Sequence, residues 1–301
     1  MKKRVLSLIL CCVLIGSMLT ACSSNSKNKE SGKEKGTIVM GGKSFTEAYL
    51  LSEIYSLALE DKGYTVDRVY DMNTDTITPA IRNGEIDMYP EYIGTALTDI
   101  IGAELETDVD AMFETVSKEF SEQWKIKWLE LTTMEDKVVM VMRSDRAKEL
   151  GVKTLTDLQK VSDQLILGDG VNFAEREDDL LRLNSIFGEF AFKVENVDYS
   201  LAYPCLEDRT VDVIPGLSTD PQLLGDTFVV IEEDKPVWPA QYVAPIVRQE
   251  VLDKNPDIEN ICNDVSKNIS TDAMIKMLDQ VVNGGEEYED VAKEFYEENC
   301  K

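Results

Sequence analysis

Short strand-like segments alternate with amphipathic helices from Thr37 onward, and this order constrains the fold more than any other feature of the chain. TIVMGG is typical of a buried strand, and in residues 44–62 apolar side chains recur every three to four positions, as in a helix. A second strand (TVDRVYDM), a helix that ends at Asn83-Gly84 and a third strand (EIDMY) complete a βαβαβ unit. Such a unit predicts a parallel sheet with right-handed crossovers, which binds ligands at the carboxyl ends of its strands.

The alternation resumes near residue 137 and gives way to a helical tail. KVVMVMR, QLILGDG, VDVIPGL and DTFVVIEED are typical of strands. The expected helices are at 154–161, 178–187 and 201–208, and the tail at 256–300 is also expected to be helical.

The two α/β units predict an α/β protein with two lobes, an interlobe cleft and a helical C-terminal segment. Lobe 1 is expected to comprise residues 37–137 and 247–301, and lobe 2 residues 138–246. Hinges are expected near residues 133–138 and 238–247, where the chain crosses between the lobes.

The N-terminus predicts export and lipid attachment. MKKR supplies positive charge, and the apolar stretch Val5–Thr20 is too short for a comfortable membrane span. Leu19-Thr20-Ala21-Cys22 resembles the bacterial lipobox, in which the cysteine is lipidated. We expect a signal peptide at 1–21, a flexible polar tether at 22–36 and a folded part anchored by Cys22 on the extracytoplasmic face of the cell membrane. An uncleaved anchor and ordinary secretion are the alternatives.

The remaining cysteines, Cys205, Cys262 and Cys300, show neither a disulfide framework nor a zinc-binding spacing. A single disulfide between Cys262 and Cys300 is compatible with an oxidising compartment. The sequence leaves open whether this pair forms.

Composition excludes several classes of function. The chain has 57 acidic and 31 basic residues, which disfavours nucleic acid as a partner. It has no histidine, so Ser-His-Asp and Cys-His catalysis and histidine metal ligation are excluded. Phosphate-binding and dinucleotide-binding glycine motifs are also absent from the sequence. We therefore expect no cofactor, no metal and no enzymatic activity, although a carboxylate-dependent surface hydrolase is not excluded.

The segment GEIDMYPEYIGTAL raises the question of what two tyrosines do where a strand ends. One interpretation is a turn, fixed by Pro90, with half-buried aromatic side chains; Tyr89 fits this structural role. The other is a ligand pocket with an aromatic wall. Residues 41–46 and 89–95 both lie at carboxyl ends of predicted strands, so both should reach the same rim of the sheet.

Several segments occur in the order seen in one family. They are GGKSFTEAYLLSEIYSLALEDKGYTV, NGEIDMYPEYIGTAL, FAEREDD, LSTD, EEDK and APIVR. Together they resemble the substrate-binding lipoproteins of ABC importers for glycine betaine, choline, carnitine and related osmoprotectants, of the OpuC and ProX type. The resemblance covers essentially the whole mature chain. It implies a type II periplasmic-binding-protein fold that closes around a quaternary amine, with an ABC permease and a separate ATPase as partners.

The resemblance also implies particular site residues. Tyr92 matches the first tyrosine of the family's aromatic cage, and Thr95 matches the hydroxyl that follows it. Lys43 matches a lysine able to meet a ligand anion, while Ser44 stands where asparagine is common. Arg176 matches the arginine that binds a ligand carboxylate.

Three cage positions depart from the family pattern, because Val138, Leu217 and Gln241 stand where the family has tyrosines. Trp238 and Tyr242, close to Gln241 in sequence, are candidates to replace the lost aromatic surface. These departures leave the ligand open between a glycine betaine-, choline- or carnitine-like amine and an amino-acid-like molecule. A ligand-sensing lipoprotein is the alternative to a transport receptor.

Overall fold

The computed structural model describes residues 35–170, 172–176 and 179–301. The expected signal peptide at 1–21, the lipidation site Cys22 and nearly all of the expected tether lie outside the described residues. Within the described part, no helix has both the length and the apolar character that a membrane crossing needs.

The first lobe is built on a five-stranded sheet with the order β2-β1-β3-β10-β4. β1 is parallel to β2 and β3, as the βαβαβ pattern predicts, whereas β10 runs antiparallel to both β3 and β4. The strands are β1 (Thr37–Lys43), β2 (Thr65–Met72), β3 (Met88–Tyr92), β4 (Ile126–Trp128) and β10 (Val243–Arg248).

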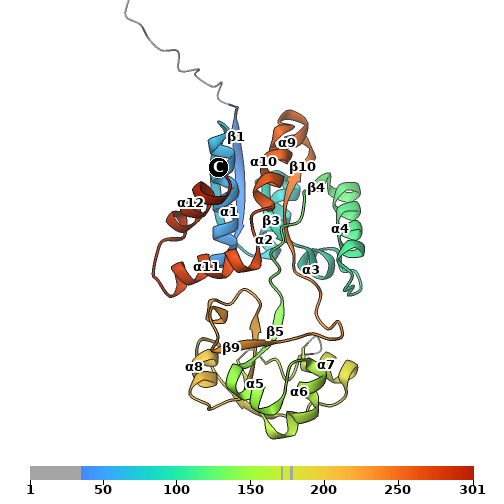
Figure 1. The fold of residues 1–301 in the computed structure, drawn as a ribbon. Helices are drawn as coiled ribbons and strands as arrows, with labels where there is room; N and C mark the ends of the chain where they lie inside the picture. Colours follow the sequence, from blue (N-terminus) through green and yellow to red (C-terminus); the bar gives the residue numbers. More distant parts are fainter. Residues whose placement is uncertain (1–34, 171, 177–178) are drawn as a thin grey trace, which may run out of the picture. The chain divides into compact units, whose positions relative to one another are not determined.

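Helices cover both faces of this sheet (Figure 1). Each face has its own apolar core. One face packs against α1 (Thr46–Asp61), α9 (Gln249–Lys254), α10 (Asp257–Ser266), α11 (Thr271–Val282) and α12 (Tyr288–Asn299). The other face packs against α2 (Thr74–Asn83), α3 (Ile93–Thr95), the π-helix Ala96–Ile101 and α4 (Val109–Trp124).

The prediction that Pro90 forms a turn is wrong, because β3 continues from Met88 through Tyr92. Pro90 lies opposite Pro245 of β10, so the two residues without an N–H face each other in the ladder. Tyr89 is fully buried in the core beneath α2 and α4, which agrees with its structural interpretation, whereas Tyr92 belongs to the core on the opposite face.

The second lobe has a five-stranded sheet with the order β7-β6-β8-β5-β9. β5 runs antiparallel to β8 and β9, and β6 is parallel to β7 and β8. The strands are β5 (Val138–Arg143), β6 (Ile166–Asp169), β7 (Lys193–Asn196), β8 (Val213–Leu217) and β9 (Phe228–Ile231). The α-helices are α5 (Ser144–Leu150), α6 (Leu155–Val161), α7 (Leu180–Phe187) and α8 (Ala202–Glu207), with two apolar clusters around them.

The chain returns to the first sheet before residue 247. β10 begins at Val243, so residues 243–246, which the sequence analysis placed in lobe 2, pair with strands of lobe 1. Trp238 belongs to a lobe-2 core and Ala240 to a lobe-1 core, so the core membership changes within two residues.

The described cysteines are free thiols, and the disulfide suggested for Cys262 and Cys300 is not formed. Cys262 is buried against α1, since it belongs to the same apolar core as Tyr55 and Leu59. Cys300 packs against this core from the C-terminal end of α12.

Candidate ligand-binding site

The edge at which β1 and β3 end brings Lys43 and Tyr92 together. These strands are neighbours and parallel, so their carboxyl ends reach the same edge. The Lys43 ammonium lies 5.1 Å from the centroid of the Tyr92 ring, and the ring of Phe45 lies 5.9 Å from it. The predicted meeting of the segments 41–46 and 89–95 is therefore present, with Tyr92 at its centre.

Lys43 already has a buried partner. Its Nζ atom lies 2.5 Å from Oε1 of Glu91, and Glu91 is fully buried. The same Oε1 atom accepts a hydrogen bond from the backbone N–H of Tyr92 at 2.6 Å, while Oε2 accepts from the Tyr89 hydroxyl at 2.8 Å. A ligand anion at Lys43 must compete with Glu91, so the role shown here is to neutralise Glu91 beneath the Tyr92 ring.

Glu47 is a site residue that the sequence analysis did not single out. The Tyr92 hydroxyl donates to Oε1 of Glu47 at 2.6 Å, and Glu47 is almost completely buried. Burial, followed by the nearby Asp136 carboxylate, raises the pKa of Glu47 to about 8, against opposing hydrogen bonds from Tyr92 and Thr219. The sequence signal that could have identified Glu47 is its position two residues after Phe45 in GKSFTE. An acidic residue at this position also fits an ordinary helix start.

Further carboxylates lie near Glu47. Asp136 accepts a hydrogen bond from the Thr219 hydroxyl at 3.0 Å, and burial raises the pKa of Asp136 to about 6. Asp220 accepts from the Tyr203 hydroxyl at 2.7 Å, and burial raises its pKa as well. Glu47, with its pKa of about 8, is mostly protonated at neutral pH, so the half-buried Asp136 supplies the negative charge that makes this region attractive to a cation.

Arg176 lies at a separate pocket of about 220 Å³ on lobe 2. Two of the departures from the family pattern, Val138 and Leu217, line the same pocket as Arg176. The lining is mainly apolar and comprises Val138, Phe173, Arg176, Asp179, Pro215, Gly216 and Leu217.

The guanidinium of Arg176 forms an ion pair with Asp179, with 3.0 Å between Nε and Oδ2. The Arg176 side chain is 52% exposed, whereas that of Asp179 is 6% exposed. A ligand carboxylate therefore has access to Arg176 but shares it with a buried aspartate.

Trp238 lies inside the lobe-2 core beside this pocket. It is 7% exposed, and its ring centroid lies 6.3 Å from that of Phe173. Its indole Nε1 donates to Oδ1 of Asp179 at 3.3 Å. Trp238 thus supports Asp179 and Phe173 from behind and does not line the pocket itself.

Gln241 lies against the segment that follows Tyr92. Its Oε1 atom accepts a hydrogen bond from the backbone N–H of Thr95 at 3.3 Å, and its amide fills the space that a side chain at Gly94 would need. Ser44 is exposed, and its backbone N–H donates to Met72. Gln241 therefore contacts Gly94 and Thr95, in the segment that follows Tyr92.

Two α/β lobes, linked by two crossing segments and carrying polar and aromatic groups where strands end, define the class of two-lobed solute-binding proteins. The family described as the substrate-binding domain of ABC-type glycine betaine transport systems matches residues 36–298, and the chain belongs to it. The protein is thus an extracytoplasmic substrate-binding component of an ABC importer, a transport protein by family.

Two curated relatives illustrate the range of the family. The chain is 28% identical to the carnitine transport binding protein OpuCC of Listeria monocytogenes over 304 residues, covering 99% of this chain and 98% of that protein. It is 27% identical to the ergothioneine transport permease/ergothioneine binding protein EgtU of Helicobacter pylori over 266 residues, covering 88% of this chain and 48% of that protein.

A solved structure described as a glycine betaine/carnitine/choline ABC transporter matches with a TM-score of 0.81. The two chains are 22% identical, and the match covers 87% of this chain and 97% of that one. This likeness confirms the predicted type II periplasmic-binding-protein fold with two lobes.

Proposed function

We propose that the protein captures a small quaternary amine or a zwitterion between its lobes and delivers it to the importer. The observation that carries this proposal is the buried, pre-positioned ring of Tyr92 beside the carboxyl groups of Glu47 and Asp136. A trimethylammonium group has no N–H to donate, so an aromatic face and nearby negative charge are the means of recognising it. The names of both relatives, which refer to carnitine and ergothioneine, agree with such a head group.

The lobe-2 pocket would hold the rest of the ligand. Val138, Phe173 and Leu217 offer apolar surface, while Arg176 supplies a cation for a ligand carboxylate. Val138 and Leu217 have smaller side chains than the tyrosines that the family has at these positions, so the pocket is wider. A wider pocket favours a ligand bulkier than glycine betaine. Contacts that form with both lobes stabilise the closed state, because only that state makes all of them. In this proposal the chain passes from lobe 1 to lobe 2 within residues 133–138 and returns to lobe 1 within residues 238–243.

A thermal-shift screen of the chain from Ser23 onward tests the ligand class. The panel contains glycine betaine, choline, carnitine, proline betaine, ergothioneine and common amino acids. A ligand raises the melting temperature by mass action, in proportion to the logarithm of its excess over Kd. We expect a quaternary amine to raise it, Tyr92→Ala to abolish the shift and Tyr92→Phe to retain most of it. A shift with amino acids alone would overturn the quaternary-amine assignment, and a shift unaffected by Tyr92→Ala would place the site elsewhere.

We further propose that Cys22 carries the lipid and that the partners are a permease and a separate ATPase. The lipobox-like residues 19–22 support the anchor. Metabolic labelling with an alkyne fatty acid tests it, since labelling should reach the wild-type chain and not Cys22→Ala. Equal labelling of the two chains would exclude Cys22 as the site.

A further inference from the structure

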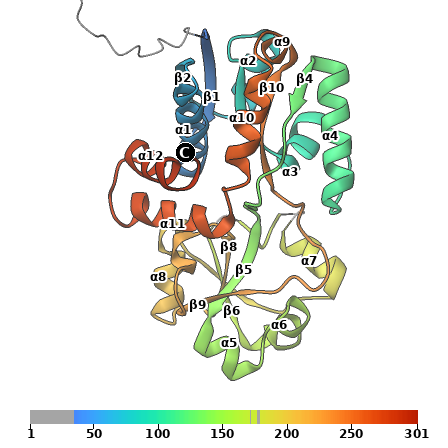
Figure 2. The same cartoon turned by 45° about the horizontal axis from the view of Figure 1, so that its top comes forward.

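Phe45 is an exposed aromatic residue in the short link between β1 and α1, at the edge of the sheet where Tyr92 lies. α1 runs back alongside β1, as Figure 2 shows, so this link follows directly on the carboxyl end of the strand. Phe45 is 40% exposed, whereas all other phenylalanines of the chain are buried or half-buried. The sheet edge of the candidate site therefore carries the most exposed phenylalanine of the protein.

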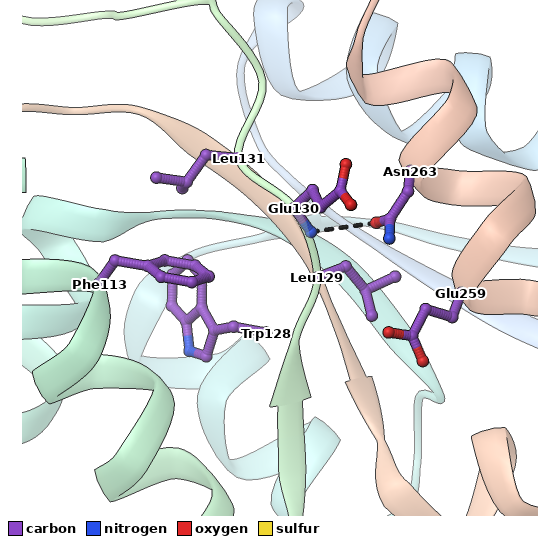
Figure 3. A pocket seen from close by; sticks show the side chains of 7 residues that line it. All are labelled: Phe113, Trp128, Leu129, Glu130, Leu131, Glu259 and Asn263. Carbon is purple, nitrogen blue, oxygen red and sulfur yellow. Dashed lines mark hydrogen bonds between the residues drawn. The ribbon is translucent and has the colours of Figure 1, made fainter. Parts of the chain in front are cut away.

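Elsewhere in lobe 1, aromatic rings pack into the interior. Phe113 and Trp128 line a separate pocket beside α4, and their rings meet edge to face with 6.4 Å between the centroids (Figure 3). Trp128 is only 4% exposed. A single exposed apolar residue is common on protein surfaces and implies no function by itself. What distinguishes Phe45 is its position in the helix and its contact with Tyr92.

Phe45 occupies the N-cap position of α1, where Ser, Thr, Asp or Asn would stabilise the helix. Its phenyl ring has no acceptor atom, and the cap position makes no side-chain hydrogen bond. α2, by contrast, begins with a capping box at Asn73. At Phe45 the chain both lacks a cap and exposes an apolar ring, so stability does not explain a phenylalanine there. Such local exceptions are expected at functional sites.

The rings of Phe45 and Tyr92 form one aromatic wall. Their centroids are 5.9 Å apart and their planes are tilted by 43°. Tyr92 is only 4% exposed, so Phe45 offers a ligand far more surface than Tyr92 does. The two residues named from the sequence as replacement aromatics do not fill this role. Trp238 is 7% exposed inside a lobe-2 core, and Tyr242 packs against the core beneath α2 and α4.

A phenyl face discriminates between two kinds of ammonium group. It attracts any cation through the negative face of the ring. A primary ammonium has three N–H donors, and it loses hydrogen bonds to water when a ring without acceptor atoms covers it. A trimethylammonium group has no N–H, so it gains the attraction without this cost. An exposed phenyl ring therefore favours methylated over unmethylated ammonium groups.

We propose that Phe45 is the solvent-facing part of the aromatic wall and selects methylated ammonium groups over unmethylated ones. This inference rests on the proposed capture of a quaternary amine at Tyr92. Tyr92 forms the buried base of the wall, and Phe45 covers the methyl groups of the ligand. Phe45 thus determines the specificity for the head group, a role separate from that of Arg176 toward a ligand carboxylate.

Isothermal titration calorimetry of the chain from Ser23 onward, which retains every described residue, measures this specificity. Each quaternary amine is paired with its unmethylated counterpart: carnitine with 4-amino-3-hydroxybutanoate, choline with ethanolamine, and glycine betaine with glycine. The readout is the ratio of the two Kd values within a pair, because a merely structural defect would weaken both members alike.

Three variants are compared with the wild type. Phe45→Leu keeps an apolar side chain without the ring, and it should reduce the preference for the methylated ligand about tenfold, since a cation–π contact is lost. Phe45→Tyr keeps the ring and should retain the preference. Phe113→Leu is the matched control: Phe113 lines a different pocket, so the ratio should be unchanged.

The possible failures separate this inference from the proposed function. Equal ratios in the wild type and Phe45→Leu would overturn the role of Phe45 and leave the proposed function standing. An equal loss for both members of a pair, or equal effects of Phe45→Leu and Phe113→Leu, would do the same. If no quaternary amine bound to the wild type, the proposed function would be wrong, and this inference with it.

Discussion

At the scale of single residues, Tyr92 shows how the candidate site is held in place. Its hydroxyl donates to Glu47, its backbone N–H donates to Glu91, and the ammonium of Lys43 lies over its ring. All four side chains are buried. The ring is therefore positioned before any ligand arrives, and less conformational freedom is lost on binding.

The buried Glu47 makes the stability of the protein depend on pH. Its pKa rises from 4.5 to about 8 in the folded protein, so the folded state holds this proton more tightly than the unfolded chain. As pH rises from about 4.5 to about 8, the unfolded chain ionises first, and the free energy of unfolding decreases over this range. We predict that Glu47→Gln gains stability over the wild type at pH 8 and much less at pH 5. Urea unfolding at both pH values measures this difference.

The exposed carboxylate of Asp75 on α2 provides the control for this measurement. Asp75→Asn should change stability little at either pH. A gain from Glu47→Gln that is equal at pH 5 and pH 8 would contradict the raised pKa.

The Lys43–Glu91 pair predicts a large effect of removing one charge. Lys43→Met leaves the fully buried Glu91 without its cation, and breaking a buried pair in this way costs about 3–5 kcal/mol. The exposed pair Lys267–Asp264 is the matched comparison, and Lys267→Met should cost less than about 1 kcal/mol. Denaturant unfolding of both variants provides the values. Equal costs would show that Lys43 does not compensate a buried charge.

Sequence reasoning placed Lys43 and Tyr92 at the same edge because parallel neighbouring strands end together. It did not find their partners Glu47 and Glu91. The position of Glu47 at the start of a helix is enough to explain an acidic residue there. The same holds for Glu91, which lies where a strand was expected to connect to a helix. Which buried cation or hydroxyl each meets depends on packing between elements that are distant in the sequence.

At the scale of secondary-structure elements, α2 is the clearest case in which local sequence determines structure. Asn73 caps its start through a reciprocal capping box with Thr76. The helix ends as predicted, at Asn83, and Gly84 follows with a φ of 80°, a conformation that glycine adopts without strain.

The cap predicts the cost of its removal. Asn73→Ala removes the acceptor for the Thr76 backbone N–H and should destabilise the protein by about 1 kcal/mol. Asn73→Asp keeps an acceptor and should cost little. Chemical denaturation of both variants checks this, and a neutral Asn73→Ala would mean that the capping box contributes nothing to stability.

Other elements could not be predicted from local sequence. β4 has only three residues and becomes a strand by pairing with β10, which comes more than a hundred residues later. β3 extends through Pro90 because β10 supplies a proline opposite it. The same strand, β10, decides where the chain returns to lobe 1, which is why the boundary expected at residue 247 differs from the start of β10 at Val243.

At the scale of the whole molecule, the two sheets divide the proposed binding surface between them. Lobe 1 supplies the aromatic ring of Tyr92 and the buried carboxyl group of Glu47. Lobe 2 supplies an apolar pocket with Arg176 at its edge. A ligand that touches both sets of residues couples binding to lobe closure, and an importer needs this coupling to distinguish the loaded receptor from the empty one.

The departures from the family pattern at Val138, Leu217 and Gln241 affect which ligand binds and do not affect the fold. The order of strands and helices identified the two-lobed class, because alternation and connection rules are general to such folds. The ligand depends on a few side chains whose neighbours come from both lobes. The sequence therefore predicted the class of protein more securely than the molecule that it carries.

The most direct test of the central claim is a distance between the lobes measured with and without ligand. Thr115 of lobe 1 and Lys193 of lobe 2 are exposed, so cysteines introduced there can carry a fluorescent donor and acceptor once the partly exposed Cys205 and Cys300 are replaced by serine. The quaternary amine that raises the melting temperature should shift the energy-transfer efficiency to one new value in the otherwise wild-type protein and leave it unchanged in the Tyr92→Ala variant. A ligand that stabilises the protein without any change in transfer efficiency would contradict capture by lobe closure.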